Sequence, residues 1–213
     1  MFANLCKASF AVGLLTLAAC SPSPSTPVAA KSDADAAKQT PAGPPQPVAA
    51  KEAFWKMYTP AHSWAPDLVT IGLKSGEAAG VKNADGKAAI WRAVFGSPSK
   101  RQSRTYVYAV ADQPPDVLKG IKGQLPEPWG GPTNAVMPFH TGDFSVDSDA
   151  AYKTAASKAS EWLKQKDNAE KPVSLSLGAA AKYEGPVWAI MFGTSKSGYL
   201  ALVNATSGEV LSK

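Results

Sequence analysis

The stretch Val187–Thr194, which reads VWAIMFGT, indicates how the rest of the chain is organised. A second copy, IWRAVFGS, occupies Ile90–Ser97, and both copies place Phe four residues after Trp, followed by Gly and a hydroxyl residue. A turn made of an acidic residue and glycine precedes each copy, beginning at Asp85 and at Glu184. A repeated order of matched elements is typical of an internal duplication. The sequence therefore predicts two copies of one small unit.

Residues 147–213 form the clearer of the two predicted units. Asp147 and Asp149 stand where an N-cap and a first-turn carboxylate stabilise a helix, and apolar residues follow at helical spacing. Val173–Leu177 then alternates apolar residues with serine, as a half-buried strand does. Two further strands are predicted at 187–192 and 199–203. The unit is thus a helix packed on an antiparallel sheet of about three to four strands, which is an α+β fold.

Residues 51–112 form the first predicted unit, in which the helix is less regular. Pro60 and Pro66 interrupt its apolar pattern, so a short or broken helix is expected. Side chains alternate between the two faces of a strand, and an arginine without a partner is rare in a core. The face that carries Arg92 should therefore lie away from the helix, and the Trp and Phe of the motif should face it. Three strands are predicted at 68–73, 88–95 and 105–111.

Residues 1–19 have the organisation of a bacterial signal peptide. Lys7 supplies a positive charge, and the apolar segment after it is shorter than the roughly 20 residues of a membrane-spanning helix. The segment ends in Leu17–Cys20, LAAC, which resembles the lipobox of bacterial lipoproteins. The resemblance implies cleavage before Cys20, lipid on its sulfur and its amine, and attachment to a membrane through that anchor. Ordinary secretory cleavage is the alternative.

The residues after Cys20 indicate where the folded part is held. Ser21 follows the cysteine instead of aspartate, which favours the outer membrane, with the folded part facing the periplasm. Residues 20–50 are rich in Pro, Ala and Ser, so we expect a disordered tether. Cys6 leaves with the signal peptide and Cys20 carries lipid, which leaves no thiol pair for a disulfide. The stability of the folded part must therefore come from a buried core.

Three stretches of the second unit resemble PepSY-like domains: Asp-Ser-Asp at 147–149, Pro-Val-Trp-x-x-x-Phe at 186–192 and Asn-Ala-Thr-Ser-Gly-Glu-Val at 204–210. In that family the last strand commonly ends in an aspartate-Ala-x-Thr-Gly-Glu pattern, and here Asn204 stands in place of the aspartate. The resemblance extends to both units, although it is stronger in the second. It implies an α+β fold in a secreted or envelope protein, with roles in peptidase inhibition or modulation and in non-catalytic interaction.

Residues 113–146 have no counterpart between the matched elements and form a predicted insert. Its Pro- and Gly-rich centre, Leu125–Pro132, excludes regular structure and carries Trp129. An exposed tryptophan without a partner is uncommon. We therefore expect the insert to clamp the two units together, with a binding loop as the alternative.

A basic cluster is predicted around the hairpin loop that follows the first copy of the motif. Lys100, Arg101 and Arg104 belong to this loop, and Arg92 lies in the strand before it. The simpler interpretation is a solvated turn. The functional interpretation is a contact site for an anionic partner, either lipid headgroups or an acidic protein face. The formal net charge of +5 is modest and spread along the chain, so no nucleic acid is indicated as a partner.

The two histidines, His62 and His140, give no sign of catalysis in the sequence. No serine lies in a Gly-x-Ser-x-Gly elbow, and surface or loop histidines are the simpler interpretation. His140 and the aspartates from Asp143 to Asp149 could supply metal ligands, but the glycine and the terminal glutamate of an EF-hand are missing. Helix capping explains these aspartates without a metal. We predict no catalytic residue, no metal and no cofactor.

These observations favour a lipid-anchored envelope protein that acts as a non-enzymatic binding or modulatory module, for example of a peptidase or an envelope complex. Two other classes stay open, namely a structural component of an envelope assembly and a hydrolase. Besides the membrane, the expected partner is a protein whose identity the sequence does not give. Cys20 is the predicted lipidation site, and the candidate binding residues are Arg92, Lys100, Arg101, Arg104 and Trp129.

Overall fold

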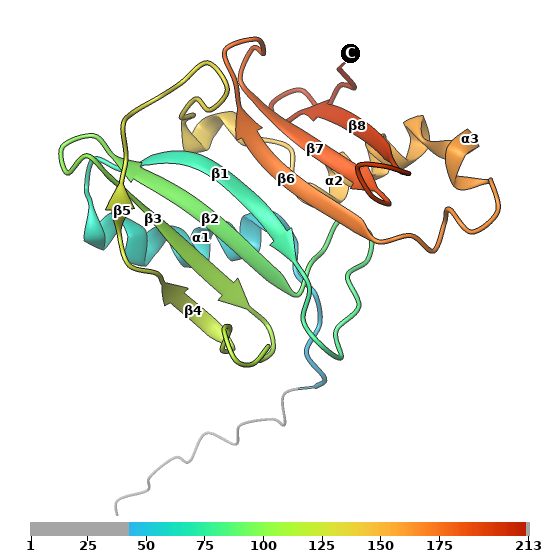
Figure 1. Ribbon diagram of the computed structural model, residues 1–213, viewed down its shortest axis with the longest axis horizontal. Helices are drawn as coiled ribbons and strands as arrows, with labels where there is room; N and C mark the ends of the chain where they lie inside the picture. Colours follow the sequence, from blue (N-terminus) through green and yellow to red (C-terminus); the bar gives the residue numbers. More distant parts are fainter. Residues whose placement is uncertain (1–42, 212–213) are drawn as a thin grey trace, which may run out of the picture. The chain divides into compact units, whose positions relative to one another are not determined.

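The computed structural model describes residues 43–211, which form a mixed α+β fold on one antiparallel sheet (Figure 1). The predicted signal peptide and Cys20 lie outside the described residues. The elements are α1 (Ala50–Trp64), β1 (Val69–Gly76), β2 (Ile90–Ser97), β3 (Gln102–Ala109), β4 (Gly120–Gly123), β5 (Glu127–Pro128), the 3-10 helix η1 (Thr141–Asp143), α2 (Ser148–Lys158), α3 (Ser160–Leu163), β6 (Val173–Ala179), β7 (Pro186–Phe192) and β8 (Tyr199–Asn204).

The two predicted meanders belong to one sheet rather than to two. Within residues 43–211 the sheet has eight strands in the order β4-β3-β2-β1-β6-β7-β8, and β5 also pairs with β3. The predicted α+β class with an antiparallel sheet is confirmed. The predicted repeat, in which each helix packs on its own three- to four-stranded sheet, is not confirmed, because the strands form one large sheet. The first strand of each meander, β1 or β6, would otherwise present an unpaired edge, and their antiparallel pairing satisfies both edges.

Helix α1 is continuous, which corrects the prediction of a short or broken helix. Pro60 lies inside it and Pro66 lies beyond its end at Trp64. A proline inside a helix removes one N–H and crowds the carbonyl four residues before it. Here the carbonyl of Pro60 accepts a hydrogen bond from the Tyr106 hydroxyl of β3 at 3.2 Å. Packing on the sheet keeps the helix continuous through the proline, because the residues on its inner side, such as Met57, are fully buried.

The folded part begins before the predicted end of the tether at residue 50. Val48 already pairs with Ala88 of the sheet region, and Ala50 is buried at the first position of α1. In the second unit, Asp147 is the N-cap of α2 as predicted. The predicted single helix is divided at Ala159 into α2 and the short α3.

The motif tryptophans lie at the centre of the core, on the predicted helix-facing side of the sheet. Trp91 and Trp188 are both 0% exposed, and their rings meet edge to face with centroids 6.3 Å apart. The indole Nε1 of Trp91 donates to the carbonyl of Val48, and that of Trp188 donates to the carbonyl of Val146, each at 2.9 Å. Each acceptor lies two residues before the helix of its own unit, so each tryptophan ties its strand to the start of that helix.

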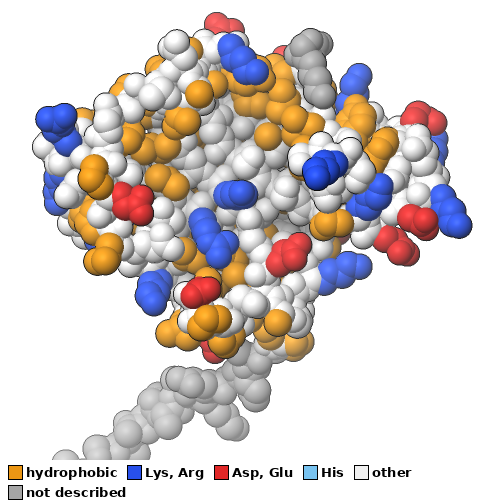
Figure 2. Space-filling model, in the orientation of Figure 1, with side chains coloured by type: hydrophobic (Ala, Val, Ile, Leu, Met, Phe, Trp, Pro, Cys, Tyr) orange, Lys and Arg blue, Asp and Glu red, His pale blue; other side chains and the backbone are white. Residues whose placement is uncertain are grey.

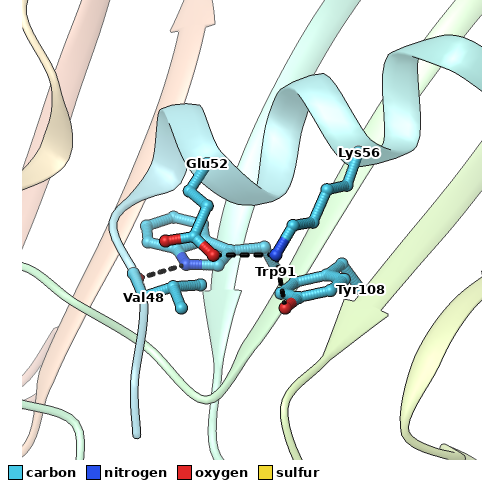
Figure 3. A network of polar contacts seen from close by, with 5 residues as sticks. All are labelled: Val48, Glu52, Lys56, Trp91 and Tyr108. Carbon is cyan, nitrogen blue, oxygen red and sulfur yellow. Dashed lines mark hydrogen bonds and ion pairs between the residues drawn. The ribbon is translucent and has the colours of Figure 1, made fainter. Parts of the chain in front are cut away.

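A second polar link joins α1 to the sheet beside Trp91 (Figure 3). The ammonium of Lys56 lies 2.7 Å from the Glu52 carboxylate and donates to the Tyr108 hydroxyl at 3.0 Å. The hydrogen bond to Glu52 is the main reason that the pKa of Lys56 is raised above 10.5. The pair is half exposed, so its contribution to stability is small.

The N-termini of α1 and α2 meet, and α2 supplies the cap that α1 lacks. The N-cap of α1 is Ala49, whose side chain cannot accept a hydrogen bond. Instead the Ala50 N–H donates to Ser148 Oγ at 2.9 Å and the Lys51 N–H donates to Asp147 Oδ1 at 3.0 Å. Ser148 is fully buried. The starts of α1 and α2 are therefore joined by two capping hydrogen bonds, of which the one to Ser148 is buried.

Candidate functional site: the open face of the sheet

The four basic residues of the predicted cluster do not form one site. Arg92 pairs with Val107 across β2 and β3, whereas Arg104 pairs with Phe95. Residues paired in neighbouring strands share a face, and faces alternate along a strand, so Arg92 and Arg104 lie on opposite faces of the sheet. Arg104 lies opposite Phe95, which is three positions after Arg92 in β2, and this odd spacing turns the two arginines to opposite faces.

Arg104 and Lys100 are already engaged on the helix side of the sheet. Arg104 donates to the carbonyl of Gln124 at 2.7 Å and lies over the ring of Tyr106. Lys100 donates to the carbonyl of Trp64 at the end of α1 and lies over its indole ring. Each side chain therefore makes one hydrogen bond and one cation–π contact within the fold. They act as links between the β2–β3 loop and neighbouring segments.

Asp67 holds the same loop in place. Its Oδ1 accepts from the Ser97 hydroxyl at 2.7 Å, and its Oδ2 accepts from the Ser99 N–H at 2.8 Å. The bond from Ser99 is the largest of the effects that lower the pKa of Asp67 from 3.8 to about 2. A loop held in this way presents Lys100 in a defined position at the end of α1.

Asp67→Asn is expected to destabilise the fold near neutral pH and to have less effect near pH 2. A carboxyl whose pKa is lowered by folding stabilises the fold above its unfolded pKa, and that contribution disappears as the pH falls through the folded pKa of about 2. Urea unfolding of both proteins between about pH 6 and pH 2 checks this. The advantage of the wild type should shrink below about pH 4, and a constant advantage over the whole range would contradict the assignment.

Trp129 of the insert lies on the other face of the sheet, over the end of β2. Its N–H donates to the carbonyl of Arg101 at 2.9 Å, which attaches the segment to the exposed turn between β2 and β3. A Cβ at Gly96 would lie 2.9 Å from the Trp129 ring and 3.0 Å from Ile71, so glycine allows the indole to lie flat on the strand. Half-buried Trp129 and Ile71 therefore form an apolar border of this face.

The later part of the insert reaches both units. The Phe139 N–H donates to the carbonyl of Thr70 in β1, and the Met137 N–H donates to the carbonyl of Ala179 in β6, each at 2.9 Å. These bonds lie beyond the paired part of β1 and β6, where the two strands diverge. The insert thus contacts the sheet on both sides of the junction between the units.

The face away from α1 and α2, here called the open face, carries a row of basic side chains. In Figure 1 both helices lie behind the sheet, so this face is toward the viewer. Strand registers place Arg92 opposite Lys74 of β1 and opposite Val107 of β3, and Val107 opposite Lys122 of β4. Lys122, Arg92 and Lys74 therefore lie in one row across four strands, which we call the basic row.

The basic row has no acidic partner within the fold. The ion pairs among residues 43–211 are Glu52–Lys56 and Glu161–Lys164, both on helices, and no described residue is hydrogen-bonded to the side chains of the basic row. Like charges placed opposite each other in a sheet destabilise it. An acidic residue, Asp116, borders the same small pocket of about 160 Å³ as Arg92 and Lys122 but lies beyond ion-pair distance. The basic row is therefore a run of positive charge that no ion pair among residues 43–211 neutralises.

The same row continues as a small and apolar surface on the second unit. Lys74 lies opposite Ser176 of β6, Ser176 opposite Ala189 of β7, and Ala189 opposite Leu202 of β8. A groove of about 260 Å³ follows this surface. Figure 2 shows Lys and Arg side chains near the middle of the face and hydrophobic side chains above them. The groove is lined by Ile71, Ala135, Val136, Ser176, Leu177, Gly178, Ala179, Ala180, Tyr183, Val187, Ala189 and Leu202.

The two histidines have separate structural settings. His62 lies on α1, where its ring stacks on Tyr58 at 5.8 Å. His140 is the N-cap of η1, and its N–H donates to Asp143 Oδ2 at 3.2 Å. Among residues 43–211, no three His, Cys, Asp or Glu side chains come together as metal ligands would. None of the helices in the described part of the chain is long and apolar enough to span a bilayer.

Comparisons with known proteins add little to this picture. No family model matches the sequence, and no curated protein matches it. Among solved structures, one match is the crystal structure of a candidate lipoprotein from Clostridium difficile, with 13% sequence identity and a TM-score of 0.44. The match covers 75% of this chain and 90% of that chain. At this level of similarity it carries no conclusion about the chain.

Proposed function

We propose that the chain is a lipid-anchored envelope protein that acts as a non-enzymatic binding or modulatory module and receives an anionic partner on the open face. The observation that carries the proposal is the basic row of Lys122, Arg92 and Lys74, which has no acidic partner in the fold and continues into an apolar groove. Arg92 is the member of the predicted basic cluster that strand register places on this surface. A binding role accounts for unpaired charge on a sheet, because the partner supplies the opposite charge.

We propose further that the folded part consists of two PepSY-like units related by a two-fold axis. The residue opposite the motif tryptophan is Ser75 in β1 and Leu177 in β6. Lys74 and Ser176 stand just before these two residues and therefore correspond to each other, and they pair with each other between β1 and β6. Corresponding residues lie opposite each other where a two-fold axis passes through a sheet. The matched Nε1 bonds of the two tryptophans support the same relationship.

The anchor and the compartment are part of the proposal. Cys20 carries the lipid, the outer membrane holds it, and the open face works in the periplasm. The resemblance to PepSY-like domains makes modulation of a peptidase or of an envelope complex the preferred role, and a structural part in an envelope assembly is the other candidate. A tether between Cys20 and Val48 would keep the open face close to the membrane and to other envelope proteins.

Site-specific cross-linking tests the proposed surface in cells that make the lipidated chain. A photoreactive amino acid at Ala189, on the open face, should give a defined adduct, and Arg92→Glu in the same chain should greatly reduce its yield. The matched control is the same amino acid at Lys153, which is exposed on α2 at the other side of the sheet. Equal yields from the two positions, or no effect of Arg92→Glu, would contradict the proposal.

A further inference from the structure

We infer that the partner of the open face is a single-chain amphiphile with a phosphate head, whose head lies on the basic row and whose chain lies in the apolar groove. The inference rests on the proposed function and names the chemistry of the ligand. Its basis is the continuity of the two parts, because Lys122, Arg92 and Lys74 lie in the same cross-strand row as Ser176, Ala189 and Leu202. A surface that is basic at one end and apolar at the other matches a ligand that has an anionic head and an apolar chain.

The charge at the basic end matches a phosphate group. Arg92 and Lys122 border one small pocket together with a single carboxylate, that of Asp116, and Lys74 adds a third cation to the row. Positive charge is therefore in excess along the basic row. A phosphate monoester carries about −1.5 to −2 at neutral pH, whereas a carboxylate carries only about −1. The guanidinium of Arg92 can bind two phosphate oxygens at once, and the lysines add point charges on either side.

Glycine keeps Arg92 accessible on the sheet surface. A Cβ at Gly76 would lie 2.5 Å from a guanidinium nitrogen of Arg92, so a side chain at that position would displace the arginine. With glycine there, the guanidinium has room to lie over Gly76 of β1. Half-burial and a defined position reduce the entropy that the side chain loses when it binds an anion.

The length and the lining of the apolar end fit one hydrocarbon chain. From Arg92 in β2 to Leu202 in β8 the whole row crosses four strand steps, or roughly 19 Å at about 4.8 Å per step. The apolar part, from Ser176 to Leu202, accounts for two of these steps, or roughly 10 Å. The floor of the groove is made of the small residues Gly178 and Ala189, and larger side chains such as Val136 and Tyr183 border it. One acyl chain can lie along such a track.

A hydrocarbon chain also suits this groove better than an acidic peptide does. The groove lies over β6 and β7, which are inner strands. Their backbone N–H and C=O groups are hydrogen-bonded to neighbouring strands on both sides. A peptide laid across them would find few partners for its N–H and C=O groups, and unpaired polar groups are costly to bury. An acyl chain has no such groups. Ser176 supplies one hydroxyl at the boundary between the two ends.

The test uses the mature chain from residue 20 with Cys20→Ser, so that its own lipid does not compete. The probes are a fluorescent lysophosphatidate and the corresponding lysophosphatidylcholine with the same chain, each below its micelle-forming concentration. The lysophosphatidate should bind saturably with one site per chain, and Arg92→Glu should weaken it about tenfold or more. Lys153→Glu on α2 is the matched control and should leave binding unchanged.

The apolar end is tested separately from the basic end. Ala189→Trp fills the groove and should weaken the long-chain probe while leaving glycerol phosphate binding unchanged, and thermal unfolding checks that the variant is folded. Equal affinity for the two headgroups, or unchanged affinity in both Arg92→Glu and Ala189→Trp, would overturn the inference.

Cross-linking from Ala189 distinguishes a failure of the amphiphile inference from a failure of the proposed function. A lipid-sized adduct supports both, a protein adduct alone overturns the amphiphile and leaves the proposed function standing, and no adduct overturns both.

Discussion

Trp188→Ala and Trp91→Ala are each expected to lower the free energy of unfolding by about 3 to 5 kcal/mol, which is the usual effect of truncating a buried large aromatic side chain. Both residues are fully buried and touch each other, so either change opens a cavity at the junction of the two units. Each change also removes the Nε1 donor of a carbonyl just before a helix. Urea unfolding monitored by far-ultraviolet circular dichroism measures the effect, since the remaining tryptophans complicate fluorescence.

Trp188→Phe is the control that separates packing from hydrogen bonding. Phenylalanine keeps most of the ring volume but leaves the Val146 carbonyl without its donor, so a smaller loss of about 1 to 3 kcal/mol is expected. If Trp188→Ala cost less than about 1 kcal/mol, the position could not be buried against α2 and the other tryptophan, and the assignment of the helix-facing side would be wrong.

Gly86→Ala is expected to destabilise the fold by about 2 to 5 kcal/mol, the sum of a backbone cost and a steric cost. Asp85 and Gly86 have φ values of 51° and 78°, the left-handed conformation of a tight hairpin turn. The turn lies against the start of α2, and a Cβ at position 86 would come within 2.7 Å of the Cα of Asp149. The first unit therefore approaches the second so closely here that only glycine fits.

Gly80→Ala is the matched control for this prediction. Gly80 has nearly the same φ, 77°, but a Cβ there would meet nothing within 4 Å. Its replacement should therefore cost only the backbone term of about 1 to 2 kcal/mol. Thermal and chemical unfolding of the two variants isolate the steric term. Equal losses for Gly80→Ala and Gly86→Ala would mean that the turn does not pack on α2.

The sequence predicts the local elements well because their causes are local. The Trp and Phe of the motif mark the buried side of β2 and β7, and Asp147 marks the start of α2. The continuity of α1 could not be predicted, because it depends on packing that outweighs the single N–H lost at Pro60. The pairing of β1 with β6 could not be predicted either. The two strand edges are joined by backbone hydrogen bonds, which any residue can make, so the sequence carries no pattern that predicts the pairing.

The candidate site was only partly predictable for the same reason. Arg92 stands out in the sequence as a charge in an apolar motif, but its neighbours on the sheet depend on strand register. Lys74 and Lys122 lie far from it along the chain and join it only through the pairing of β1 with β2 and of β3 with β4. Counting residues along the predicted hairpin could have shown that Arg104 and Arg92 lie on opposite faces. Residues that pair across two strands share a face, and the face alternates from one residue to the next.

The central claim is that the open face, and not the helix side, receives the partner. The most direct measurement is the yield of photo-cross-linked adduct from Ala189 relative to that from Lys153, in cells that make the lipidated chain. The account predicts a defined adduct from Ala189 that falls on Arg92→Glu and on added salt, with little adduct from Lys153. An adduct of equal or greater yield from Lys153, insensitive to Arg92→Glu, would contradict it.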